Sequence, residues 1–150
     1  MKNLYETAAA QEIKDRIARL GPASQRQWGK MTAAQAVAHC SVAMEWAVGD
    51  ARPSRMFIGR IFGPLAKSKM LKDETPMSRN APTTKSLVVA DDRDLATERQ
   101  RLCALIDRFT TAGPQGCTTH PHSFFGPMTP QEWAALMYKH LDHHLRQFSV

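Results

Sequence analysis

The clearest amphipathic pattern in the chain lies near its end, where residues 133–148 read as one helix. His140 and His144 fall in the middle of the apolar face of this helix, one turn apart. Lys139 and Asp142 fall on the opposite side, pointing to solvent or nearly so. Two imidazoles four residues apart on one face have the spacing at which a helix can chelate a single metal ion.

Three further segments show a helical pattern of apolar positions, over residues 4–20, 32–48, and 91 or 92 to about 111. Capping boxes mark the starts at Thr32 and Thr129, each followed three residues later by Gln or Glu. The apolar face of the second segment consists mostly of small residues, so a neighbouring helix can pack closely against it. His39 lies at the border of that face, where it could reach a partner helix.

Residues 53–72 could form a third, shorter helix, which Gly59, Gly63 and Pro64 would leave interrupted or partly irregular. Residues 73–90 are expected to form a long loop, with residues 87–89 as a short extended piece. A loop of this length in a small domain often covers a site. Several helical patterns with little strand signal predict an all-α fold, an antiparallel four-helix bundle with long connections, built as one domain over residues 1–150.

The composition narrows the class of protein. The 150 residues are 43% hydrophobic and 23% charged, an ordinary globular balance. Three cysteines without a C-x-x-C pair argue against a disulfide framework and for a reducing compartment, so we expect a cytoplasmic protein. The net charge of +6 invites a nucleic-acid interpretation, but the basic residues are scattered apart from one loose cluster over residues 52–72. We therefore expect no nucleic acid as partner, and no membrane either, because no apolar run approaches the length of a membrane span.

His39, His140 and His144 together would offer three neutral nitrogen ligands and leave positions open for water or substrate, as in catalytic metal sites. Imidazole suits a divalent transition metal, zinc or nickel, and does not suit magnesium or calcium. The H-E-x-x-H protease pattern fails, because Leu141 stands where that motif has glutamate. The alternative is that these histidines lie at the edge of the core, hydrogen-bonded to their neighbours.

Other candidates near the site remain open in the sequence. His120 and His122 flank Pro121 and would either line a pocket or stabilise the turn. His143 lies at the edge of the histidine-bearing face. Gln147 would either orient an imidazole or serve as a polar residue at the core edge.

No carboxylate is convincingly placed for general-base chemistry. Glu45 falls on the outer face of its helix, so a carboxylate would have to come from Glu12 or from elsewhere. Cys40 follows His39 but points away from it, which indicates core packing.

Three stretches of the chain resemble the DinB/YfiT-like family of metal-dependent four-helix bundle proteins. They are residues 28–39 (W-G-K-M-T-A-A-Q-A-V-A-H), 120–133 (H-P-H-S-F-F-G-P-M-T-P-Q-E-W) and 138–148 (Y-K-H-L-D-H-H-L-R-Q-F). The resemblance is closest to a small bacterial branch still labelled as a domain of unknown function. It implies that His39, after the Trp-x-x-Met-Thr helix start, joins His140 and His144 as a metal ligand.

Members of that family with assigned activities are similar to thiol-dependent transferases, such as mycothiol-dependent isomerases and bacillithiol transferases, or to metal-dependent hydrolases. The resemblance thus implies a metal-dependent enzyme acting on a small molecule, with a low-molecular-weight thiol among the candidates. The alternative is a non-catalytic bundle that binds a metal or small ligand and that could form a homodimer. A nucleic-acid-associated protein is the third and weakest interpretation.

Overall fold

The computed structural model describes residues 1–81 and 83–150. This part of the chain is all-helical and contains no strand, only an isolated bridge between His122 and Gly126. The elements in chain order are α1 (Thr7–Arg19), α2 (Ala33–Val48), α3 (Phe57–Met70), the 3-10 turn η1 (Lys85–Leu87), α4 (Leu95–Ala112), the 3-10 turn η2 (Pro114–Gly116) and α5 (Pro130–Arg146). Among the described residues, no helix has both the length and the apolar character needed to cross a membrane.

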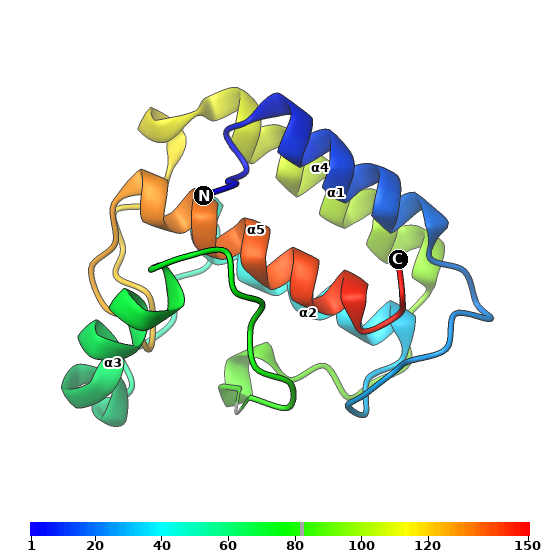
Figure 1. The fold of residues 1–150 in the computed structure, drawn as a ribbon, viewed down its shortest axis with the longest axis horizontal. Helices are drawn as coiled ribbons and strands as arrows, with labels where there is room; N and C mark the ends of the chain where they lie inside the picture. Colours follow the sequence, from blue (N-terminus) through cyan, green and yellow to red (C-terminus); the bar gives the residue numbers. More distant parts are fainter. Residues whose placement is uncertain (82) are drawn as a thin grey trace.

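Helices α1, α2, α4 and α5 pack around one core, and α3 projects away from them (Figure 1). The largest fully buried apolar side chains of this core come from all four of these helices and from the N-terminal segment: Leu4, Ile13, Ile17, Met44, Leu102, Ile106, Phe109, Trp133 and Leu141. The predicted helical bundle is therefore present. The small residues of α2 let α4 and α5 approach closely on its two sides.

The bundle is only partly antiparallel. Ion pairs join Glu45 to Arg101 and Asp50 to Arg108, so α2 and α4 run in the same direction. The bond from the Leu4 amide to the Ala134 carbonyl and the pair between Arg16 and Asp142 show that α1 and α5 are also parallel. The two remaining neighbours, α2 with α5 and α1 with α4, are antiparallel. Helices α2 and α4 are parallel because the long connection between them, which carries α3, returns the chain to the end of the bundle at which α2 begins (Figure 1).

Side-chain caps fix where the site-bearing helices begin. Both predicted capping boxes are formed, Thr32 with Gln35 at α2 and Thr129 with Glu132 at α5. The start predicted for α4 at Asp91 or Asp92 is wrong by a few residues. Asp94 caps this helix instead, because its carboxylate accepts the Thr97 amide at 2.8 Å.

Helix α3 differs from its prediction, because it is continuous through Pro64. Pro64 is exposed, and so is Arg60, the residue whose carbonyl loses its helical donor to the proline. Gly59 and Gly63 are buried against the backbone of Phe124, so these glycines allow a close approach and do not break the helix. The short extended piece predicted for residues 87–89 is also altered, since Leu87 closes the 3-10 turn η1.

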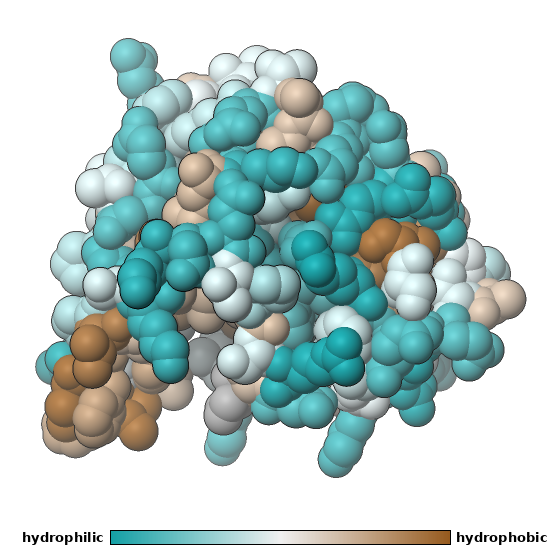
Figure 2. All heavy atoms as spheres, viewed as in Figure 1, coloured by the Kyte–Doolittle hydropathy of each residue, from teal (hydrophilic) through white to brown (hydrophobic). Residues whose placement is uncertain are grey.

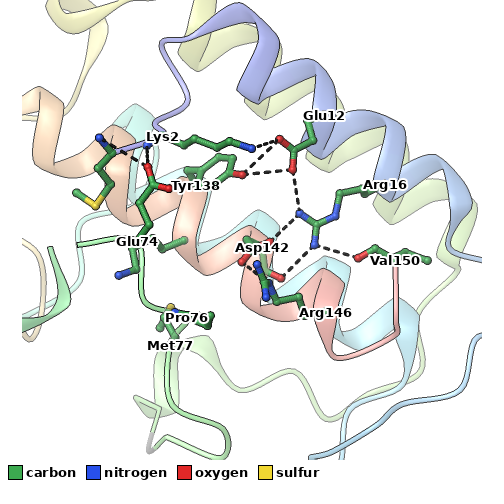
Figure 3. Close-up of a pocket in the computed structure, with 12 residues that line it drawn as sticks. Lys2, Glu12, Arg16, Glu74, Pro76, Met77, Tyr138, Asp142, Arg146 and Val150 are labelled. Atoms are coloured by element: carbon green, nitrogen blue, oxygen red, sulfur yellow. Dashed lines mark hydrogen bonds and ion pairs between the residues drawn. The ribbon is translucent and has the colours of Figure 1, made fainter. Parts of the chain in front are cut away.

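Two residues predicted near solvent on α5 are engaged in the fold. Lys139 is buried and its Nζ donates to the carbonyls of Met70 at 2.7 Å and Asp73 at 2.9 Å, tying the end of α3 to α5. Asp142 accepts from Arg16 and from Arg146, each at 2.7 Å (Figure 3).

A network of charged groups continues from Asp142 along the α1–α5 contact (Figure 3). Arg16 also donates to the Val150 carbonyl at 2.9 Å, and Glu12 binds Lys2 at 2.6 Å and the Tyr138 hydroxyl at 3.3 Å. Each charge in this network has an opposite partner, so the network serves to hold α5, both chain ends and α1 together.

Replacing Gly63 by alanine tests how α3 is attached. Alanine favours a helix by about 1 kcal/mol over glycine, but its Cβ would meet the Phe124 carbonyl oxygen, and such overpacking costs roughly 1–3 kcal/mol. We expect faster amide hydrogen exchange across residues 57–70, measured by mass spectrometry. The matched control is Gly21→Ala, whose Cβ would meet open space. Slower or unchanged exchange in Gly63→Ala would show that the close approach is not what holds α3.

Candidate metal centre

Three histidines meet at the antiparallel contact between α2 and α5. One ring nitrogen from each of His39, His140 and His144 lies within 4.8 Å of the others. The Nε2 atoms of His39 and His140 are 2.9 Å apart, and the three ring centroids are separated by 4.6 to 4.9 Å. Residues predicted to converge from opposite ends of the sequence are therefore brought together, in a group that could hold a metal ion.

Hydrogen bonds on the outer side of the cluster fix the tautomer of two of the rings. Nδ1 of His39 lies 2.7 Å from the Leu87 carbonyl oxygen, which can only accept, so this nitrogen carries the proton. Nδ1 of His144 lies 3.0 Å from Oε1 of Gln147, which also accepts. In the neutral rings of His39 and His144, Nε2 consequently keeps its lone pair.

The orientation of Gln147 is itself fixed. Its Nε2 donates to the Trp28 carbonyl at 2.7 Å, which leaves Oε1 for His144. Gly29 permits this contact, because its φ is +76° and a Cβ at this position would collide with Nε2 of Gln147. Gln147 is the C-cap residue of α5, one position beyond the last helical turn. Its predicted position beside an imidazole is thus what the structure shows.

The surroundings hold the three rings neutral. Burial lowers the pKa of His140 well below its usual value, and the neighbouring imidazoles act in the same direction. Burial, with a smaller contribution from His39, lowers the pKa of His144 to about 3. Burial also lowers the pKa of His39, although the Leu87 carbonyl opposes that change. Neutral imidazoles are the form that binds metal, so no proton has to be removed from a charged ring near pH 7.

The three histidines line a pocket of about 450 Å³. Two connecting segments, around residues 28–31 and 77–89, form its walls, so the long loop does cover the site as predicted. Trp28 contacts the ring of His143 at 5.6 Å between centroids, and the guanidinium of Arg79 stacks over Trp28 at 4.3 Å. No carboxylate is among the described residues that line this pocket.

The remaining sequence candidates lie elsewhere. Nε2 of His120 bonds the Pro53 carbonyl at 2.9 Å, and neither His120 nor His122 lines the pocket. Glu45 pairs with Arg101, and Glu12 belongs to the charged network between α1 and α5. Cys40 is buried in the core, and burial raises the pKa of its thiol, as the packing interpretation requires.

The fold and the site define an all-helical protein with a three-histidine cluster at a helix–helix contact. The chain belongs to a family described as a protein of unknown function (DUF1569), whose pattern matches residues 2–150. No curated protein and no solved structure gives a significant match to the chain.

His122 takes the turn-stabilising role that the sequence left open. Its ring lies between Trp46 and Trp133, with centroids 5.5 and 5.4 Å away, and its Nδ1 accepts the amides of Phe124 and Phe125, each at 3.1 Å. Burial, with a smaller contribution from the charge of Arg55, lowers the pKa of His122 to about 4.

This shift predicts how stability depends on pH. An unfolded histidine titrates near 6.5, so the unfolded chain takes up the proton first and His122 destabilises the fold as pH falls from about 6.5 to about 4. The loss amounts to about 3 kcal/mol at about 1.4 kcal/mol per unit of pKa. In His122→Asn, which keeps an acceptor but does not titrate, the free energy of unfolding should fall less steeply over this range. Urea titrations with chelator present measure it. Parallel curves for the variant and the wild type would contradict the role given to His122.

Proposed function

We propose that His39, His140 and His144 bind one divalent transition-metal ion, zinc or nickel, and that the protein is a metal-dependent enzyme of the hydrolase or thiol S-transferase type. The observation that carries the proposal is the convergence of three neutral imidazoles from two helices, two of them with Nε2 lone pairs set by outer hydrogen bonds. Such outer partners are the usual companions of metal-binding histidines.

The donor set fits this class of ion. All three candidate ligands are imidazoles, which bind zinc, nickel and related ions and bind magnesium or calcium poorly. Three protein ligands leave further coordination positions for an exchangeable molecule, as catalytic zinc sites do. An all-hydrogen-bonded arrangement satisfies the cluster less well, because among the described residues the contact between His39 and His140 uses both of their Nε2 atoms and leaves Nε2 of His144 without a partner.

The resemblance to the DinB/YfiT-like family supports the same assignment. The stretches that carry it include the start of α2 through His39 and the histidine-bearing part of α5. Its implied ligand set coincides with the three residues that meet in space. Both the DinB/YfiT-like relationship and the enzymatic class remain part of this proposal.

Chemically, a divalent ion at this position would supply Lewis acidity to a water molecule or a thiol. The chain would orient the metal-binding imidazoles and select the molecules that enter the pocket. The Leu87 carbonyl and Gln147 hold the imidazoles, and the pocket volume of about 450 Å³ suits a small molecule. Among the residues that the structure describes, its lining contains Lys30 and no carboxylate, so an anionic or electron-rich group such as a thiolate would not be repelled.

Metal content tests the ligand set. Protein purified without a histidine tag should contain one transition-metal ion per chain by elemental mass spectrometry. His39→Gln keeps a donor for the Leu87 carbonyl but offers a poor metal ligand. It should weaken metal affinity by more than about a hundredfold, which exceeds the loss expected when only a hydrogen-bond partner of a ligand is removed. The control is His120→Gln, which removes an imidazole away from the cluster. Equal metal content in the two variants would exclude His39 as a ligand.

One observation favours a second function. Among the described residues that line the pocket, there is no carboxylate that could accept a proton. A non-catalytic bundle that binds a metal or small ligand would need no such group. The two functions separate in a panel of low-molecular-weight thiols and esters assayed with and without chelator. The enzymatic proposal expects turnover that chelator abolishes, zinc or nickel restores and His39→Gln lacks. Metal binding without turnover across the panel would leave the binding protein as the function.

A further inference from the structure

Helix α3 exposes a continuous apolar face. Phe57, Ile58, Ile61, Phe62 and Leu65 occupy one side of the helix, and each is at least half exposed, with Phe57 at 78% and Leu65 at 74%. Figure 2 shows these hydrophobic residues gathered over the projecting helix. The opposite side of α3, through Gly59 and Gly63, sits on the Phe124 backbone, so the orientation of the apolar face is fixed by packing.

The net positive charge of the chain is concentrated at the same place. Residues 52–72 contain six basic residues and no acidic one, while the rest of the chain has fourteen of each sign. The whole formal charge of +6 is therefore accounted for by this segment. Arg52, Arg60, Lys69 and Lys72 are exposed, whereas Lys67 is paired with Glu132 at 2.9 Å.

We propose that α3 is an interfacial helix that binds the surface of an anionic lipid membrane, with its apolar face in the lipid and the flanking cations at the headgroups. An amphipathic helix with basic flanks binds in the plane of the interface through both contributions. The sequence predicts no membrane partner, because no apolar run approaches the length of a membrane span. The exposure of the apolar face of α3 in the structure changes that expectation.

A second copy of the chain is the competing occupant of this face. In a two-fold contact through α3, each copy would bring the same apolar face and the same flanking cations to the interface. The repulsion between the four exposed cations of one copy and those of the other, with no acidic residue in the segment, opposes that contact. The same charges attract anionic headgroups, so charge complementarity favours the lipid surface.

Vesicle co-sedimentation tests the proposal with the full-length chain. Wild-type protein should bind phosphatidylcholine vesicles containing phosphatidylserine and should not bind vesicles of phosphatidylcholine alone. Phe57→Ser/Leu65→Ser removes apolar surface from two exposed positions and should weaken binding by about tenfold or more. Lys69→Glu/Lys72→Glu should weaken binding by more than about tenfold, since each cation near the surface contributes about 1 kcal/mol.

The charge variant has a matched control. Arg19→Glu/Arg26→Glu makes the same change in net charge at two exposed positions outside α3, and it should bind as the wild type does. Absence of binding by the wild type, equal binding to neutral vesicles, or equal loss in both charge variants would overturn the proposal. Light scattering tests whether a second copy of the chain covers the face instead. If the wild type is a dimer that Phe57→Ser/Leu65→Ser converts to a monomer, the face serves self-association and the membrane proposal is overturned. Metal content should be unchanged in the α3 variants, so failure here is separable from failure of the metal site.

Discussion

The cost of placing three uncharged imidazoles at one helix–helix contact is the constraint on which the site depends. A buried polar ring without partners is unfavourable by about 1–3 kcal/mol, and a buried charged ring by more. Hydrogen bonds on the outer side of the cluster offset this cost. The Leu87 carbonyl accepts a hydrogen bond from Nδ1–H of His39, and Oε1 of Gln147 accepts one from Nδ1–H of His144. On the inner side, the Nε2 lone pairs of His39 and His144 remain, close to a ring nitrogen of His140. That arrangement is poor for a self-contained core and good for a bound cation.

The same outer bonds connect the cluster to the walls of the pocket. Leu87 belongs to the long loop between α3 and α4, and Gln147 is bonded to Trp28 in the segment before α2. The loop is therefore attached to His39 through one hydrogen bond, and the segment before α2 is attached to His144 through two, with Gln147 between them. A displacement of either wall would change the direction in which a ring nitrogen points, so the access to the site and the geometry of the ligands are physically coupled.

The sequence predicted the elements better than their environments. Capping boxes and apolar spacing located α2 and α5 closely, because these signals are local and involve only neighbouring residues. The helix faces placed His39 where it could reach a partner helix, and the resemblance to the DinB/YfiT-like family implied that it joins His140 and His144. The hydrogen bond between His39 and the Leu87 carbonyl could not be predicted, since every residue has a main-chain carbonyl and the residue type gives no sign of which one is used. Lys139 was misplaced because a long side chain on a polar face can fold back to bind carbonyls of another segment.

Helix α3 shows a different limit of sequence reasoning. Apolar residues at helical spacing predict an amphipathic helix, but the pattern is the same whether the face meets a core or the outside of the molecule. Here the core is complete without it, since the four other helices supply the buried cluster apart from short connecting segments. Burial would have stabilised five large side chains, and the fold instead directs them outward and buries two glycines. Because this orientation is unfavourable for the isolated chain, the exposed face of α3 is best explained by a contact with another molecule. That contact would lie at a place distinct from the histidine cluster.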